Sequence, residues 1–91
     1  MKYKLVFTHS YSRRAARFLR KHPDLLRQYE KTLELLELNP FHPSLRLHKL
    51  KGSLSDLHSA SINITYRITL ELWINDATIL PLDIGSHDEV Y

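Results

Sequence analysis

The sequence predicts an α+β fold in which two N-terminal helices pack on a mainly antiparallel sheet of about four strands. Three observations lead to this prediction. Apolar residues recur at helical spacing through residues 10–38. From residue 45 onward they recur at every second position, which is the period of a β-strand. A short alternating segment precedes the helices, so the element order is a strand, two helices and a meander of strands, an order typical of helices layered on a sheet.

Length and composition limit the class of protein. The chain has 91 residues, which suits a single domain over residues 1–91. It has no cysteine, so disulfides and thiolate nucleophiles are excluded. No apolar run approaches the roughly 20 residues that span a bilayer, and the opening MKYKLVFTHS lacks the small-residue cleavage site of a signal peptide. We therefore expect a cytoplasmic protein without a membrane partner.

The net charge of +3 hides an asymmetry along the chain. Residues 1–31 carry nine Lys/Arg against two acids, a net charge of +7, whereas residues 32–91 carry four Lys/Arg against eight acids, a net charge of −4. Like charges at i, i+4 on a helix repel, so a solvated helix face usually intersperses acids. The first helical segment instead favours binding of a polyanion or an acidic protein segment. Its five cations are Arg13, Arg14, Arg17, Arg20 and Lys21.

The first three elements follow from local signals. In segment 2–7 (KYKLVF), Tyr3, Leu5 and Phe7 face one way and the residues between them face the other, which predicts a strand. Thr8 or Ser10 can cap the helix that follows. Pro23 ends that helix and suits the first turn of the second one, which in turn ends before Pro40. Because the break between the helices is short, we expect them to form an antiparallel hairpin.

Four period-two segments complete the chain, at residues 45–50, 57–62, 66–74 and 78–84. Segment 66–74 alternates most clearly and places Arg67 on the face opposite its apolar residues. Pro81, inside the last segment, requires an edge position or a bulge because proline has no N–H to donate. Ser86–Glu89 fits a Ser-x-x-Glu capping box, which predicts a short helical turn at the end of the chain.

Histidine, arginine and aromatic residues are the candidates for chemistry. The six histidines include no His-x-x-x-His pair, and two glycines are too few for a phosphate loop, so we expect no metal and no cofactor. Histidine can transfer protons near neutral pH. Arginine can hold phosphate oxygens, and an aromatic ring can stack on a base. Together they could cleave RNA through its own 2′-hydroxyl, although spacing alone leaves each histidine open to an ordinary surface role.

Three segments carry a resemblance to a known family: LRLHKLKG (residues 45–52), SINITYRI (61–68) and DIGSHDEVY (83–91). In their order and spacing they resemble the RelE/ParE toxin superfamily of bacterial toxin–antitoxin systems, and most closely its YafQ-like mRNA interferases. The likeness covers essentially the whole chain, including the opening strand and the basic first helix. It implies a metal-independent endoribonuclease that acts on mRNA in the ribosome, and a tight complex with a protein antitoxin.

The resemblance also implies roles for individual residues. The catalytic positions fall on His48, His87, Arg67 and Tyr91. The two histidines match groups that transfer protons, the arginine matches a group that holds the scissile phosphate, and the tyrosine matches a terminal aromatic that orients or stacks on RNA. RNA-binding positions are Lys49 and Lys51, which would assist electrostatically, and the five cations of the first helix, which would bind ribosomal RNA phosphates.

One position departs from the family pattern. Ser61 aligns with a second family histidine, and His58 lies three residues earlier, on the opposite face of a strand. Two alternatives to an active nuclease therefore stay open. One is a ParE-like poison of DNA gyrase, in which the histidines are incidental. The other is a weakened toxin homologue that keeps only its binding to an antitoxin.

Overall fold

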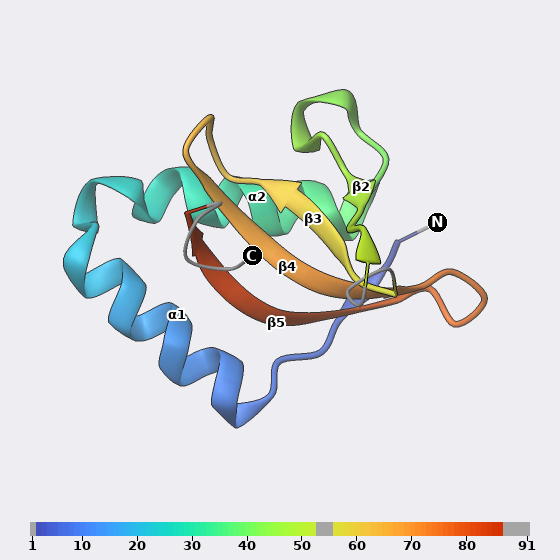
Figure 1. Cartoon of the computed structure of the whole chain (residues 1–91), viewed down its shortest axis with the longest axis horizontal. Helices are drawn as coiled ribbons and strands as arrows, with labels where there is room; N and C mark the ends of the chain where they lie inside the picture. Colours follow the sequence, from blue (N-terminus) through green and yellow to red (C-terminus); the bar gives the residue numbers. More distant parts are fainter. Residues whose placement is uncertain (1, 53–55, 87–91) are drawn as a thin grey trace.

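The computed structural model describes residues 2–52 and 56–86, which form a five-stranded sheet and two helices (Figure 1). The strand order across the sheet is β1-β5-β4-β3-β2. This confirms the predicted α+β fold, with one strand more than expected. The elements are β1 (Lys4–Leu5), α1 (His9–Lys21), the 3₁₀ turn η1 (Pro23–Leu25), α2 (Leu26–Leu38), the 3₁₀ turn η2 (Pro43–Leu45), β2 (His48–Lys49), β3 (His58–Ser61), β4 (Tyr66–Trp73) and β5 (Thr78–Ser86).

Helix α1 begins at a capping threonine. The Thr8 hydroxyl accepts the backbone N–H of Tyr11 at 3.1 Å, which satisfies one of the free donors of the first turn. The helix buries Tyr11, Ala15 and Phe18, which recur at i, i+4 and i+7 and so lie on one side. That side faces the core, and the cations lie on the exposed remainder of the helix.

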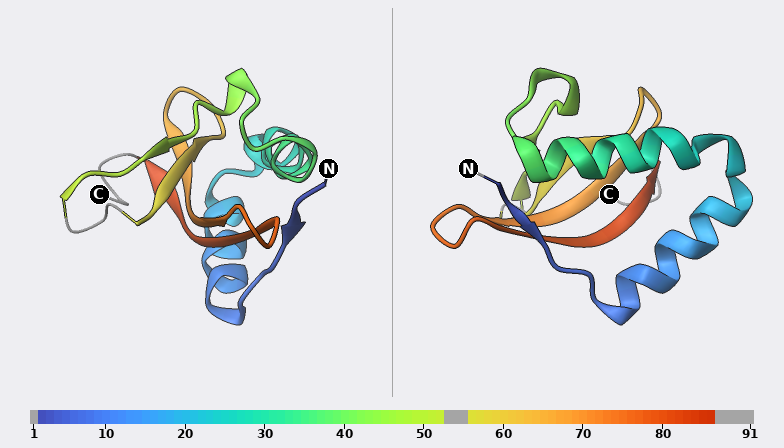
Figure 2. Two further views of the ribbon diagram at one scale, coloured as in Figure 1. Left: turned by 90° about the vertical axis from the view of Figure 1, so that its right-hand side faces the viewer. Right: turned by 180° about the vertical axis from the view of Figure 1, so that it is seen from behind.

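The two helices diverge from a corner at η1 and form a V, rather than the side-by-side hairpin that the short break predicts (Figure 2). Helix α2 crosses one face of the sheet, whereas α1 runs beside the outer edge of β5 (Figures 1 and 2). Inside the core, the hydroxyl of Tyr11, near the start of α1, lies 2.8 Å from that of Tyr29, in the first turn of α2, and this contact joins the two helices. Within residues 2–52 and 56–86, neither helix is long and apolar enough to cross a membrane.

Strand β1 is shorter than the predicted segment 2–7 and pairs in parallel with β5. The backbone N–H groups of Lys4 and Val6 donate to Ala77 and Ile79 at 2.8 and 2.9 Å. The chain then leaves the sheet because Thr8 caps α1, which begins at His9. The prediction was a mainly antiparallel sheet, and the parallel pairing of β1 with β5 makes the sheet mixed.

Strand β2 is also shorter than its predicted segment 45–50. Pro43 starts the turn η2, and Arg46 has a φ of +47°, in the left-handed region that interrupts an extended backbone. Extended pairing with β3 therefore begins only at His48. The remaining strands, β3, β4 and β5, lie where the period-two pattern predicted them.

Strand β5 carries the bulge that Pro81 predicted. Thr69 pairs with Asp83 and Leu70 pairs with Pro81, so the extra residue Leu82 has no partner across the ladder. The extra residue resets the alternation of β5. As a result Asp83 points away from the core, on the face opposite α2. The predicted turn at Ser86–Glu89 lies mostly outside the described residues.

The core lies between the helices and the sheet. Its centre is β4, whose Ile68 and Leu70 are fully buried. The buried cluster also contains apolar residues of both helices, of η2, of β3 and the residue after it, and of β5, namely Tyr11, Ala15, Phe18, Tyr29, Leu36, Leu45, Ala60, Ile62, Ile79 and Ile84.

The tyrosine pair gives a test of the bridge between the helices. Burial raises the pKa of both Tyr11 and Tyr29, so each hydroxyl keeps its proton and one donates to the other. We expect Tyr29→Phe to lower the free energy of unfolding by about 1–3 kcal/mol, because the Tyr11 hydroxyl loses its buried partner. Tyr11→Phe combined with Tyr29→Phe should lose less than the two single variants added together. Urea denaturation measures both, and additive losses would contradict the bridge.

His58 gives a pH test of the core side of β3. Burial lowers its pKa below 6.5, and the charges of Lys49 and His48 lower it further. The unfolded chain therefore binds the proton more readily, so this group's contribution to stability is complete above the unfolded pKa and is lost as the pH falls toward the folded one. Unfolding free energies of wild type and His58→Leu, measured from about pH 8 to pH 5, should show the steeper loss in wild type. Parallel curves would contradict this assignment.

Candidate functional site

The candidate site lies on the sheet face that α2 does not cover, called here the open face. Cross-strand pairing aligns two rows of residues there. Residues directly opposite each other on neighbouring strands have their side chains on the same face of the sheet. Two such rows that are two residues apart along a strand are separated by about 7 Å. The first row runs from β2 to β5 through His48, Ser59, Thr69 and Asp83, and the second from β3 to β5 through Ser61, Arg67 and Gly85.

His48 is held by a backbone contact at the β2 edge of the open face. Its Nδ1 lies 3.0 Å from the carbonyl oxygen of Arg46, and the side chain is exposed. A carbonyl only accepts, so this contact favours the tautomer in which Nδ1 carries the hydrogen. The Nε2 atom then has a free lone pair directed to solvent. His48 therefore has the form that a general base needs.

Arg67 lies in the middle of the open face and is half-buried. Its Nε is fully buried and has no hydrogen-bond partner among residues 2–52 and 56–86. On one side it pairs with Ser61 and on the other with Gly85, which has no side chain to cover it. A guanidinium cannot give up its charge, so a buried N–H without an acceptor favours an incoming anion. Phosphate oxygens suit the fork geometry of this donor.

Two buried hydroxyls extend this donor set. Ser59 and Thr69 are directly opposite each other and are 0% and 4% exposed, and in the part of the chain that the structure describes neither hydroxyl has a hydrogen-bond partner. Buried polar atoms are nearly always paired in folded proteins, so such groups mark strain, a bound water or ion, or a ligand site. They lie one row from Arg67, so three donors without partners gather at the centre of the open face.

The other residues predicted around β2 and β3 lie elsewhere. Lys49 pairs with His58, and His58 with Leu70, so both lie on the core side of the ladder. Lys49 is exposed at that edge and does not share a face with His48. Lys51 is exposed in the loop after β2. Ser61, which aligns with a family histidine, does lie beside Arg67, whereas His58 lies on the opposite face, as the spacing predicted.

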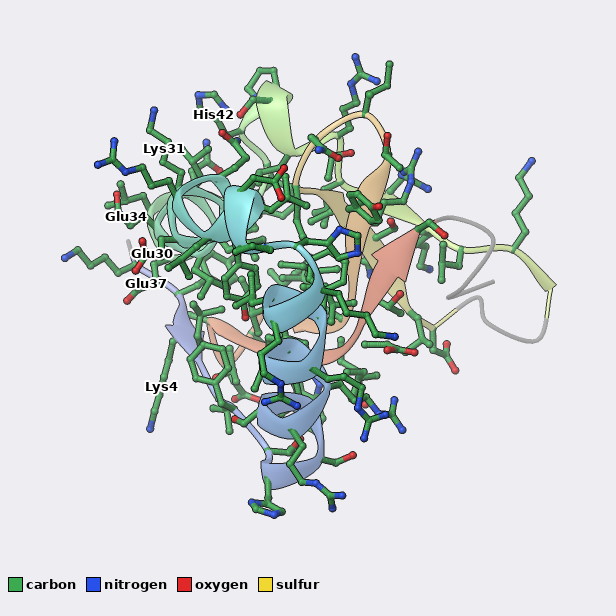
Figure 3. The ribbon with its side chains drawn as sticks, turned by 90° about the vertical axis from the view of Figure 1, so that its left-hand side faces the viewer. Lys4, Glu30, Lys31, Glu34, Glu37 and His42 are labelled. Atoms are coloured by element: carbon green, nitrogen blue, oxygen red, sulfur yellow. The ribbon has the colours of Figure 1, made fainter. Side chains whose placement is uncertain are left out.

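The basic residues of the first helix are all exposed and come from one element. Figure 3 shows the contrast with α2, whose outer surface mixes Glu30, Lys31, Glu34 and Glu37. Helix α1 has no acid at all. Three of its cations line a cavity of about 340 Å³ between α1 and β5, called here the α1–β5 cleft. Its lining includes Arg14, Arg17 and Lys21, the rings of Phe18 and His22, and Asp83.

Two predicted catalytic residues, His87 and Tyr91, lie outside the described residues. Sequence reasoning missed the buried hydroxyl of Ser59 and the carboxylate of Asp83. The alternation of small polar and apolar residues in HSASI, residues 58–62, was the available signal for Ser59. Asp83 had no such signal, because the bulge in β5 decides which face it joins.

A potential metal centre would need several ligating side chains close together. Within residues 2–52 and 56–86, no group of three or more His, Asp or Glu side chains could hold a metal ion. The arrangement that the described residues do offer is one of anion-binding donors beside a histidine.

Comparisons with known proteins agree on the fold. No protein-family model matches the chain, and no curated protein matches it in sequence. The crystal structure of YafQ from Escherichia coli strain BL21(DE3) has a TM-score of 0.78 at 14% identity, covering 99% of each chain. YafQ in the E. coli DinJ–YafQ toxin–antitoxin complex has a TM-score of 0.77 at 17% identity, covering 100% of this chain and 99% of that one.

A more distant match is the YoeB/ParE toxin from Agrobacterium tumefaciens, with a TM-score of 0.73 at 17% identity over 92% of this chain and 98% of that one. These similarities extend along nearly the entire chain and include both helices and the sheet. The chain therefore has the fold of the YafQ and YoeB/ParE toxin structures, as the sequence resemblance predicted.

Proposed function

We propose that this chain is the toxin of a toxin–antitoxin pair and a metal-independent endoribonuclease that cleaves mRNA in the ribosome. The observation that carries the proposal is Arg67 on the open face, whose buried Nε has no hydrogen-bond partner among the described residues. Two further unpaired hydroxyls lie one row away, and His48 stands at the edge of the same face. A phosphate that reaches these buried donors would be held close to a base.

The proposed reaction uses the RNA's own 2′-hydroxyl as nucleophile. A histidine removes the proton of that hydroxyl, and the oxygen attacks the adjacent phosphorus. The bond from phosphorus to the 5′-oxygen of the next nucleotide breaks, and an acid protonates the leaving oxygen. The products are a 2′,3′-cyclic phosphate and a 5′-hydroxyl. Arg67 stabilises the additional negative charge on the phosphate oxygens as the new bond forms.

Roles are divided between the two histidines by position. His48, with Nε2 free to accept a proton, is the proposed base. His48 and Arg67 are two strand spacings and one row apart. In a flat sheet this places their Cα atoms about 12 Å apart, so both side chains can reach one phosphate. By resemblance to the YafQ-like family, His87 is the proposed acid and Tyr91 stacks on RNA.

Charge and fold similarity support the two proposed partners. The α1 cations Arg13 and Arg20, which do not line the α1–β5 cleft, suit ribosomal RNA phosphates. YafQ, whose fold this chain shares, has been solved in a complex named for its toxin and antitoxin. We propose that an acidic or amphipathic antitoxin segment binds the basic side of α1 and the sheet edge.

Substitution of Arg67 tests the phosphate-binding role. We expect Arg67→Gln to lower the rate of mRNA cleavage about 10²- to 10³-fold, because one charge-stabilising donor is removed from the transition state. Primer extension on cellular mRNA after induced expression measures the cuts. The matched control is Arg27→Gln, which removes the same charge from the exposed surface of α2, away from the open face. Equal cleavage by the two variants would contradict the role of Arg67.

Substitution of the histidines tests the proton transfers. His48→Gln and His87→Gln should each lower cleavage by about 10²- to 10⁴-fold and relieve growth arrest while leaving the melting temperature unchanged. A control is His42→Gln, whose histidine is exposed in the connector before η2. Full growth arrest by folded His48→Gln and His87→Gln proteins would refute these assignments. DNA breaks with intact mRNA would instead identify a gyrase poison, and the absence of both would identify a weakened homologue.

A further inference from the structure

The α1–β5 cleft has features that a generally basic helix surface would not need. It lies along the part of the β5 edge that β1 does not pair with, where α1 packs against β5. The guanidinium of Arg14 donates to the carbonyl of Leu82 there, at 3.3 Å. The same guanidinium lies 3.6 Å from the carboxylate of Asp83. Among the described lining residues, Asp83 is the one acid and is already paired with Arg14, and the remaining charge of these residues is positive.

Arg17 and Lys21 provide that positive charge. They lie one helical turn apart on α1, both are exposed, and among the described residues neither has an ion-pair partner. Two free cations converging on one cavity can bind a phosphate group, which takes hydrogen bonds on several oxygens. If Arg17 or Lys21 were paired with a carboxylate, fewer of their N–H donors would be available to a phosphate.

A cluster of three rings lies beside these cations, and two of the three, Phe18 and His22, line the cleft. The ring centroids of Phe18 and His22 are 4.6 Å apart, those of His22 and Tyr66 4.8 Å, and those of Phe18 and Tyr66 5.1 Å. Phe18 is buried, so the cluster is fixed in the core, whereas His22 is half-buried and lines the cleft. A ring fixed by two others is a surface on which a nucleobase can stack.

The cleft adjoins the proposed catalytic face. Gly85 is the direct partner of Arg67, and Asp83, two residues earlier on the same face, lines the cleft. One strand spacing, about 5 Å, separates the β4 position of Arg67 from β5. An RNA strand with one phosphate at Arg67 can therefore continue around the edge of β5 into the cleft.

We propose that the α1–β5 cleft binds one nucleotide of single-stranded RNA next to the cleaved one. Arg17 and Lys21 hold its phosphate, and its base stacks on His22. The inference rests on the proposed function for the identity of the polymer as RNA. An acidic peptide would use the two cations equally well, but a nucleotide carries a phosphate and a flat aromatic base in one unit, so the combination of cations and a fixed ring favours a nucleotide.

The test is direct binding of a short RNA that cannot be cleaved. The probe is a fluorescein-labelled, fully 2′-O-methylated hexanucleotide, because methylation removes the nucleophile while keeping phosphates and bases. Anisotropy titrations at several salt concentrations give both affinity and its salt dependence. Replacing both Arg17 and Lys21 by Gln should weaken binding at least tenfold, and should reduce the salt slope by about 0.7 for each phosphate that the variant no longer neutralises. Arg27→Gln, the control for charge, should bind nearly as wild type does.

The ring is tested separately from the charge. His22→Leu keeps the volume but loses the aromatic face, and should weaken binding about 5- to 150-fold. His22→Phe restores an aromatic face and should recover most of the affinity. Thermal melting of each variant checks that the ring cluster still folds. If His22→Leu melts far below wild type, the role of the ring is judged from His22→Phe compared with wild type. Binding of the RNA by His22→Phe then supports the stack, and loss of binding overturns it.

The outcomes separate this inference from the proposed nuclease. Unchanged affinity in the folded cleft variants, or no binding of the hexanucleotide by wild type, would overturn the inference. A glutamate-rich peptide that binds as tightly as the RNA, with no effect of His22→Leu, would also overturn it and identify a protein-binding surface. Hexanucleotide binding that depends on the cleft, in a protein that makes no cuts in mRNA, would refute the nuclease and leave the nucleotide site standing.

Discussion

The alternation of β4 is the constraint on which the rest of the molecule depends. Ile68 and Leu70 are fully buried against the helices, so the residues between them must point to the other face. Arg67 and Thr69 therefore reach the open face because the core fixes the register of the strand. A slip of one residue would bury a guanidinium in the core and expose two large aliphatic side chains. The free energy that stabilises the fold thus also holds the candidate site in place.

The bulge in β5 and the path of α1 depend on this register. One extra residue in β5 turns Asp83 toward the open face, and the edge of β5 that β1 leaves free is covered by α1. Arg14 joins the two elements by contacts to a β5 carbonyl and to Asp83. Cations from a helix and donors from a sheet therefore meet at one end of β5, although they come from distant parts of the sequence.

The sequence predicted the features that depend on local periodicity and local caps. The buried stripe of α1, the Thr8 cap, the faces of β4 and the bulge at Pro81 all follow from neighbouring residues. The V of the helices, the parallel β1 and the short β2 depend on where distant segments pack, and the sequence alone did not reveal them. The ring cluster of Phe18, His22 and Tyr66 is a contact of this long-range kind. The roles of His87 and Tyr91 stay predictions from the family resemblance.

In the proposed mechanism the open face holds a phosphate while histidines move protons and the RNA supplies its own nucleophile. The most direct test of this mechanism is the chemical identity of the RNA ends at the cleaved sites. The cuts are made by purified protein on mRNA in ribosomes, in a buffer of constant Mg²⁺ concentration. The mechanism predicts a 2′,3′-cyclic phosphate or its 3′-phosphate product upstream, and a 5′-hydroxyl downstream. A 5′-phosphate on the downstream fragment would contradict it, because that end requires attack by water in place of the 2′-hydroxyl.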